Sequence, residues 1–156
     1  MSLDVAQLRG LRQPDARSCG PSALVAARML LDGRTVSRDE FGARVLALHR
    51  DVTSVAGAGL PWPRALGTPP WGAARRLAAW TGTRHRTRVN RWRHLSPEAC
   101  GRAEPVLVYV GSRWLPRHVL LVAQERVYDP ARGTVAPAYD GRWRTTWLVV
   151  EPTGSR

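Results

Sequence analysis

The order of the secondary-structure signals along the chain constrains its fold more than any other feature. In the first half, apolar residues recur at the spacing of an amphipathic helix in three segments: 18–32, 37–50 and 68–81. The second half has short runs rich in β-branched residues, which predict strands at 84–89, 106–110, 118–123, 126–128 and 147–150. Helices followed by strands are typical of an α+β fold with an antiparallel sheet. We expect a single domain over residues 1–156, with a helical half at about 1–82 and a sheet half at about 83–156.

Local signals place the ends of several of these elements. Ser37 and Glu40 form a capping box at the start of the second helix, and Thr68 is a candidate N-cap for the third. Asp32-Gly33 and Thr81-Gly82 are expected helix stops. Residues 51–70 contain many glycines and prolines and predict a long irregular loop, such as the wall of a cleft. A short helical turn is expected at 96–100, and a tight turn at Gln124-Glu125.

A cysteine stands at the expected start of the first helix, in the stretch from Gln13 to Ala23. Pro21 suits the first turn of that helix, where its missing N–H costs nothing. The first N–H groups of a helix have no intrahelical partner and favour negative charge, and hence a thiolate over a thiol. Taken alone, such a cysteine is more often a small buried apolar residue, so Cys19 becomes a candidate nucleophile only together with further residues.

A base and a carboxylate follow Cys19 along the chain. His118 begins a predicted strand, and Asp129 ends the next one. A tight turn between the two strands would bring these side chains together. Cys19 would attack, His118 would move the proton, and Asp129 would fix the histidine tautomer. Gln13, six positions before Cys19, would help the Cys19 N–H hold the oxyanion.

The residues of this pattern resemble the papain-like cysteine peptidases, and within them the bacteriocin-leader (double-glycine) peptidase domains. The resemblance rests on Gln13, on Cys19-Gly20 at a helix start, on His118 before apolar residues, and on Asp129-Pro130-Ala131. It implies a papain-like fold in which N-terminal helices pack on a C-terminal antiparallel sheet. It also implies hydrolysis of a peptide bond through a thioester, with a peptide or protein substrate and no cofactor. A related amidase or acyltransferase would use the same acyl-enzyme.

Charge favours a second class of function. All 24 basic residues are arginines, and the formal net charge is +12. The densest cluster is Arg84–Arg93, which would suit a basic module that binds nucleic acid or an acidic protein partner. A coding bias toward arginine explains the same composition without function. A third hypothesis is a catalytically silent papain-like domain that serves only for interaction.

Other candidate residues rank lower. Trp62, Trp71 and Trp114 are candidate cleft walls, Trp114 because it precedes His118 by four residues. We interpret Cys100 as structural and His49 as a helix-end residue. His85 and His94 lack the ligand spacing of a metal site, so no metal is expected. Neither a secretory signal nor a membrane span is visible, and two cysteines do not make a disulfide framework, so we expect a cytoplasmic protein. The sequence does not give an oligomeric state.

Overall fold

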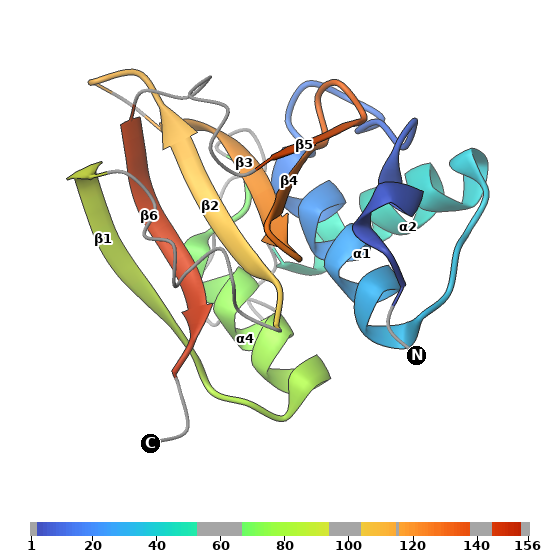
Figure 1. Cartoon of the computed structure of the whole chain (residues 1–156), viewed down its shortest axis with the longest axis horizontal. Helices are drawn as coiled ribbons and strands as arrows, with labels where there is room; N and C mark the ends of the chain where they lie inside the picture. The colour runs from blue at the N-terminus through green and yellow to red at the C-terminus, as the bar shows by residue number, and fades with distance from the viewer. Residues whose placement is uncertain (1–2, 53–66, 94–103, 115, 138–144, 154–156) are drawn as a thin grey trace.

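The computed structural model of the chain describes residues 3–52, 67–93, 104–114, 116–137 and 145–153, with the side chains of 91–93 left out. Within these ranges a short 3-10 helix, η1 (Val5–Leu8), precedes three α-helices: α1 (Cys19–Asp32), α2 (Arg38–Val52) and α4 (Pro70–Thr81). Six strands follow: β1 (His85–Arg93), β2 (Val106–Gly111), β3 (Pro116–Ala123), β4 (Arg126–Asp129), β5 (Thr134–Pro137) and β6 (Thr145–Pro152). The predicted order of helices before strands is therefore confirmed (Figure 1).

The strands form one sheet in the order β1-β6-β2-β3-β4-β5, and every neighbouring pair is antiparallel. The predicted tight turn joins β3 to β4. Gln124 and Glu125 have φ values of 52° and 59°, the positive pair that a two-residue type I′ hairpin turn requires. The Gln124 side chain also accepts a hydrogen bond from Val5 N at 2.9 Å and donates one to Leu3 O at 2.8 Å. The turn is thereby tied to the N-terminal segment.

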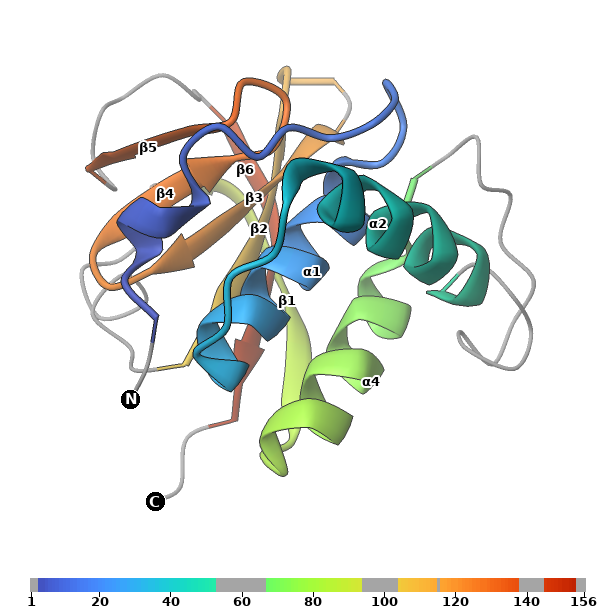
Figure 2. The ribbon, with the colours of Figure 1, turned by 90° about the vertical axis from the view of Figure 1, so that its right-hand side faces the viewer.

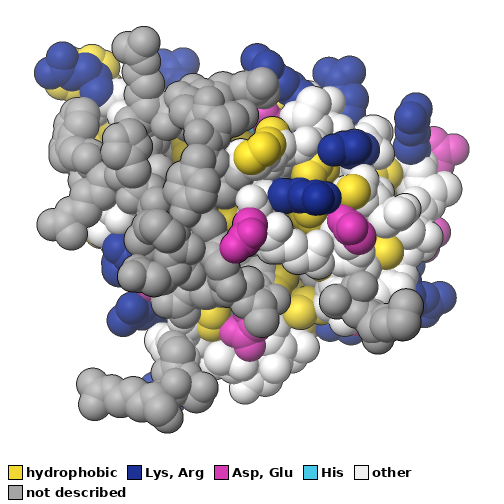
Figure 3. Space-filling model, in the orientation of Figure 1, with side chains coloured by type: hydrophobic (Ala, Val, Ile, Leu, Met, Phe, Trp, Pro, Cys, Tyr) yellow, Lys and Arg dark blue, Asp and Glu magenta, His cyan; other side chains and the backbone are white. Residues whose placement is uncertain are grey.

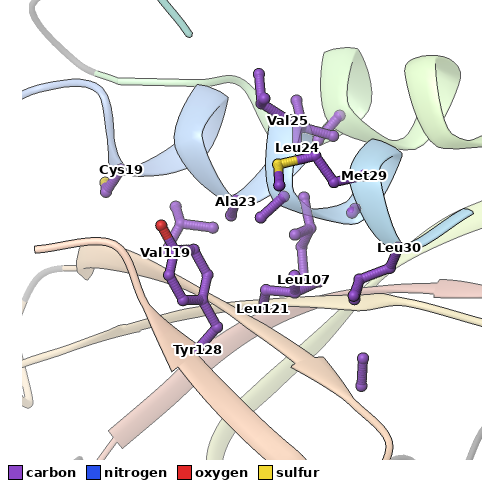
Figure 4. Packing of buried hydrophobic residues seen from close by; sticks show 14 of the residues in the cluster. Cys19, Ala23, Leu24, Val25, Met29, Leu30, Leu107, Val119, Leu121 and Tyr128 are labelled. Carbon is purple, nitrogen blue, oxygen red and sulfur yellow. The ribbon is translucent and has the colours of Figure 1, made fainter. Parts of the chain in front are cut away.

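The helices cover one face of the sheet. α1 packs on β3, α4 packs on β1 and β6, and α2 lies on the outer side of α1 (Figure 2). The buried side of α1 faces Leu107, Val119, Leu121 and Tyr128 of the sheet (Figure 4). α1 is buried along most of its length, because it lies between the sheet and a second layer of helix. Burial of this apolar cluster is the main favourable term in the stability of the fold.

A second apolar cluster lies on alternate residues of the same strands. Its members are Val106, Val108, Val110, Leu120, Val122 and Val149. Because successive side chains of a strand point to opposite faces, a strand that is buried on both faces needs apolar residues at every position. The unbroken apolar run of β2 therefore reflects two buried faces.

Both predicted glycine stops end their helices. Gly33 and Gly82 take the left-handed conformation, with φ of 66° and 70°, and their N–H groups bond to Met29 O and Ala78 O. The Ser37 hydroxyl accepts from Glu40 N at 3.1 Å, as the capping box predicted. None of the helices in the described ranges combines the length and apolar character that crossing a membrane would require.

Several predicted boundaries were wrong. α2 continues to Val52, β1 to Arg93, and β6 is twice as long as the predicted four-residue run. β5 was missed, because four residues that are exposed or half-buried carry little alternation. Thr68 is not the N-cap of α4; Pro69 is, and Thr68 is buried at the helix entrance. The predicted turn at 96–100 and most of the predicted loop lie outside the described residues.

Side chains of α2 also depart from prediction. The apolar spacing of segment 37–50 includes Leu46, which we expected on the buried face of the helix, but it is 42% exposed, whereas His49 is buried. The positions that face α1 are Phe41, Val45, His49 and Val52, spaced by four, four and three residues. His49 lies in the last turn of α2, as predicted, but the helical spacing also places it on the buried side, which its polar side chain did not indicate.

Candidate active site

Cys19 is the first residue of α1, and it is 9% exposed. Its side chain lies at the head of the helix, across from Val119 and Tyr128 of the sheet (Figure 4). Ser18 precedes it as the N-cap, yet its hydroxyl donates to Asp15 O at 3.2 Å and makes no side-chain cap bond to the helix. The first N–H groups of α1 are therefore not occupied by the side chain of the capping residue.

His118 and Asp129 lie on the paired strands β3 and β4. The register pairs Leu121 with Tyr128, so its extension sets Asp129 opposite residue 120, two positions from His118. Residues two apart on a strand share a face, which makes the two side chains diagonal neighbours. His118 Nε2 lies 2.7 Å from Asp129 Oδ1. The same oxygen accepts from Ala131 N at 2.9 Å, which fixes the carboxylate.

His118 also contacts the Cys19 side chain. Burial of the ring acts to lower the pKa of His118, but its hydrogen bonds to Asp129 and Cys19, with the charges of both groups, outweigh burial and raise this pKa to about 9. Burial would raise the pKa of Asp129, but its bond to His118, the histidine charge and the Ala131 N–H lower it. Because Asp129 takes Nε2, the other ring nitrogen, Nδ1, is left for Cys19. The structure thus brings Cys19, His118 and Asp129 together.

Gln13 lies on a segment that runs beside the Asp129 turn. Its backbone N–H bonds to Pro130 O at 2.8 Å, and Gly10 N bonds to Gly133 O at 2.8 Å. The Gln13 Nε2 donates to Asp15 O at 2.7 Å, which uses one of its two N–H groups. The side-chain oxygen of Gln13 is buried and has no hydrogen-bond partner among the described residues. The oxyanion role of Gln13 stays a prediction.

A small cluster beside Cys19 was not predicted from the sequence. It consists of Gly20, Thr68 and Tyr109. Tyr109 donates its hydroxyl to Thr68 O at 3.0 Å. Burial, and then the negative charge at Cys19, raise the pKa of Tyr109. A Cβ at Gly20 would lie 2.6 Å from the Cβ of Thr68 and closer still to its hydroxyl oxygen, which itself has no hydrogen-bond partner. The sequence indicates this close contact with Thr68 only through the glycine that follows Cys19, because a glycine lets another segment approach closely.

The structure describes two of the three tryptophans that were predicted to line a cleft. Trp114 is 73% exposed, and the Arg113 guanidinium lies 4.5 Å from the centre of its ring. Trp71 is 38% exposed in the first turn of α4. Trp62 lies outside the described residues. Their role in a cleft stays a prediction.

The arginine cluster at 84–93 forms most of the edge strand β1. Arg86 and Arg88 pair with the buried carboxylate of Glu151, at 3.0 Å and 3.1 Å. Part of this basic charge is therefore neutralised within the fold. His85 Nδ1 lies 2.8 Å from Thr83 O. The part of the chain that the structure describes contains no group of three or more His, Cys, Asp or Glu side chains suited to a metal.

Comparison with known proteins gives a likeness among solved structures. No family model and no curated protein matches the chain. Among solved structures, the chain is similar to the peptidase domain of Streptococcus ComA, described as a bi-functional ABC transporter involved in a quorum-sensing pathway. The likeness has a TM-score of 0.52 at 18% identity, and it covers 93% of this chain and 97% of that one. It establishes the fold as α+β and papain-like, as predicted.

Proposed function

We propose that this protein is a cysteine peptidase of the bacteriocin-leader (double-glycine) type. The observation that carries the proposal is the position of His118 between the Cys19 side chain and Asp129. The fold supports it, because the similar solved structure is a peptidase domain of nearly the same extent. A buried histidine that bonds to both a thiol and a carboxylate is the arrangement that nucleophilic cysteine catalysis requires.

In the proposed reaction, the Cys19 thiolate attacks the carbonyl carbon of the scissile peptide bond. The oxyanion accepts hydrogen bonds from the Cys19 N–H and from the second N–H of Gln13 Nε2. Protonated His118 then gives its proton to the leaving nitrogen, the C–N bond breaks, and an acyl thioester remains on Cys19. His118 next takes a proton from water, and the resulting hydroxide attacks the thioester. The carboxylic product leaves, and the thiolate and the imidazolium are restored.

Asp129 contributes through charge and orientation. The carboxylate holds Nε2 of His118, which directs Nδ1 toward the sulfur and stabilises the imidazolium. If an amine replaced water in the second half of the reaction, the same thioester would give acyl transfer. That variant needs no other residue and is the nearest alternative activity.

Trapping of the acyl-enzyme tests the proposal. The protein would be mixed with peptides that contain Gly-Gly sites, and the reaction would be quenched in acid. Intact mass and peptide mapping of the protein would then locate any adduct. We expect an acyl adduct on Cys19, turnover in the Cys100→Ala variant, and none in Cys19→Ala or His118→Gln. Adducts on Cys100, or turnover by Cys19→Ala, would refute the assignment of the nucleophile.

Two further measurements separate the other hypotheses. Iodoacetamide should label Cys19 faster than Cys100 at mildly acidic pH, where an ordinary thiol is protonated. Fast labelling of Cys19 without turnover of any peptide would favour a silent interaction domain. A basic binding module would instead bind a DNA duplex with an affinity that falls steeply with salt.

A further inference from the structure

Four exposed arginines lie on the three segments that carry the proposed catalytic residues. They are Arg12, Arg17, Arg117 and Arg132. Arg17 is two residues before Cys19, and Arg117 directly precedes His118. The backbones of Arg17 and Arg117 therefore lie beside these two residues, because neighbouring Cα atoms are about 3.8 Å apart. The inference drawn from them rests on the proposed peptidase function.

The other two arginines belong to the turn that follows Asp129. Arg12 donates from its guanidinium to Ala131 O at 3.3 Å and 3.4 Å, which holds it over that turn. Arg132 lies close enough for its charge to act on the Asp129 carboxylate. Arg12 is therefore held by the backbone of this turn, and Arg132 lies near the carboxylate at its start.

Salt bridges distinguish these four arginines from many others in the molecule. Six arginines form salt bridges with carboxylates away from the site: Arg28, Arg44, Arg76, Arg86, Arg88 and Arg126. Within the described residues, none of the four near the site does so. These segments also carry the exposed carboxylate of Asp15, whose Oδ1 accepts a hydrogen bond from the backbone N–H of Arg17 at 2.8 Å.

The surface view agrees with this distribution. The start of β3, the end of β4 and the segment that enters α1 lie at the same end of the molecule (Figures 1 and 2). Basic side chains project along that upper edge in the space-filling view (Figure 3). Exposed charges act over roughly 8 Å at physiological ionic strength, so basic side chains on the segments that carry the site would attract acidic residues of a bound peptide. We propose that the site selects peptides with Asp or Glu residues close to the scissile bond.

Matched peptides test this proposal on the full chain. Three fluorogenic peptides with the same Gly-Gly site would differ only in carrying Glu, Gln or Lys directly before the Gly-Gly pair and directly after it. We expect kcat/KM to fall in that order, and the advantage of Glu over Gln to shrink as salt rises. Replacing Arg17 or Arg117 by Gln should reduce cleavage of the Glu peptide about two- to fivefold each, the range of exposed ion pairs. Cleavage of the Gln peptide should change little.

Arg34→Gln is the matched control. Arg34 is exposed, and it follows the far end of α1 from Cys19. Its loss lowers the net charge by the same amount, so an effect equal to that of Arg17→Gln would reduce the preference to net charge and overturn the proposal. Equal cleavage of the Glu and Gln peptides by the unmodified chain would also overturn it. Circular dichroism would establish that each variant is folded.

A binding measurement keeps the inference independent of turnover. Fluorescein-labelled Glu, Gln and Lys peptides would be titrated into Cys19→Ala and followed by anisotropy. Tighter binding of the Glu peptide that depends on Arg17 and Arg117 would support the inference even if cleavage failed, in which case only the proposed peptidase function would fall. Equal binding of the three peptides would refute it. Binding of a DNA duplex through the same arginines without binding of the Glu peptide would refute it as well, in favour of nucleic acid.

Discussion

The ring of His118 lies between the side chains of Cys19 and Asp129, and its Nε2 atom is 2.7 Å from Asp129 Oδ1. This relationship joins residues from the head of a helix and from two strands. Asn at position 129 keeps an oxygen that can accept from Nε2 but removes the charge. Since a charge-assisted hydrogen bond is worth about 1 to 2 kcal/mol more than a neutral one, we expect Asp129→Asn to lower kcat/KM roughly tenfold. Peptide cleavage measured against pH checks this.

Two variants control for that prediction. Asp129→Ala also removes the acceptor for Ala131 N, so it should lose more activity and more stability. Asp32→Asn breaks the exposed pair with Arg28 and should leave cleavage unchanged. An Asp129→Asn variant with wild-type rates at every pH would show that the carboxylate charge has no part in the reaction.

The pKa of His118 predicts how stability depends on pH. This pKa is about 9 in the folded chain and 6.5 for an ordinary histidine. A group whose pKa is raised by folding stabilises the native state fully below its unfolded value, and the contribution is lost as pH rises through the folded value. Thermal unfolding should therefore show the wild type losing stability between pH 6.5 and about 9 relative to His118→Gln. A constant difference between the two proteins over that range would contradict the ion pair.

Cleavage should fall over the upper part of the same range. His118 must carry a proton to protonate the leaving nitrogen, so kcat/KM should decline as pH rises through about 9. In Asp129→Asn this decline should move to lower pH, because the opposite charge no longer supports the imidazolium. A decline at the same pH in both proteins would assign the titration to another group.

The close contact of Gly20 with Thr68 predicts a steric effect beside the nucleophile. A methyl group at Gly20 would overlap Thr68, so Gly20→Ala should destabilise the chain by about 1 to 3 kcal/mol and slow labelling of Cys19. Thermal unfolding and iodoacetamide rates check both effects. Adding Thr68→Gly removes the atoms that collide and should restore the labelling rate, whereas Thr68→Ser keeps them and should not.

Gly42 supplies the control for that experiment. A Cβ at Gly42 would meet only Pro14, at an ordinary 3.9 Å, and the residue lies inside α2. Gly42→Ala should therefore stabilise the chain by up to about 1 kcal/mol through helix propensity. If Gly20→Ala were equally harmless, the tight packing beside Cys19 would be refuted.

The sequence predicted those parts of the fold that local chemistry decides. The apolar run at 118–123, and the two residues that separate it from the short strand at 126–128, predicted the β3–β4 hairpin and hence the pairing of His118 with Asp129. Gly33 and Gly82 marked the helix ends because their conformation suits glycine. The short strand β5 and the Thr68 contact were missed, because they depend on which segments meet in space. The same limit kept Tyr109 out of the predicted site, since an apolar strand gives no sign that a hydroxyl reaches across to another segment.

Tyr109 and Tyr128 permit a matched comparison of two buried hydroxyls. Tyr109 bonds to Thr68 O at 3.0 Å, and Tyr128 bonds to Leu11 O at 2.7 Å. Each Phe substitution leaves a carbonyl without its partner and should cost about 1 to 3 kcal/mol, or several degrees in Tm. Of the two, the pKa of Tyr109 is raised by the charge at Cys19 and that of Tyr128 by the charge of Asp129, in each case after burial. We therefore expect Tyr109→Phe to change the rate at which iodoacetamide labels Cys19, and Tyr128→Phe to alter mainly the alkaline decline of cleavage. Identical changes in labelling would mean that both hydroxyls act only through general stability. A specific effect on the sulfur is expected of Tyr109 alone, because it bonds to Thr68, which packs against Gly20 beside Cys19.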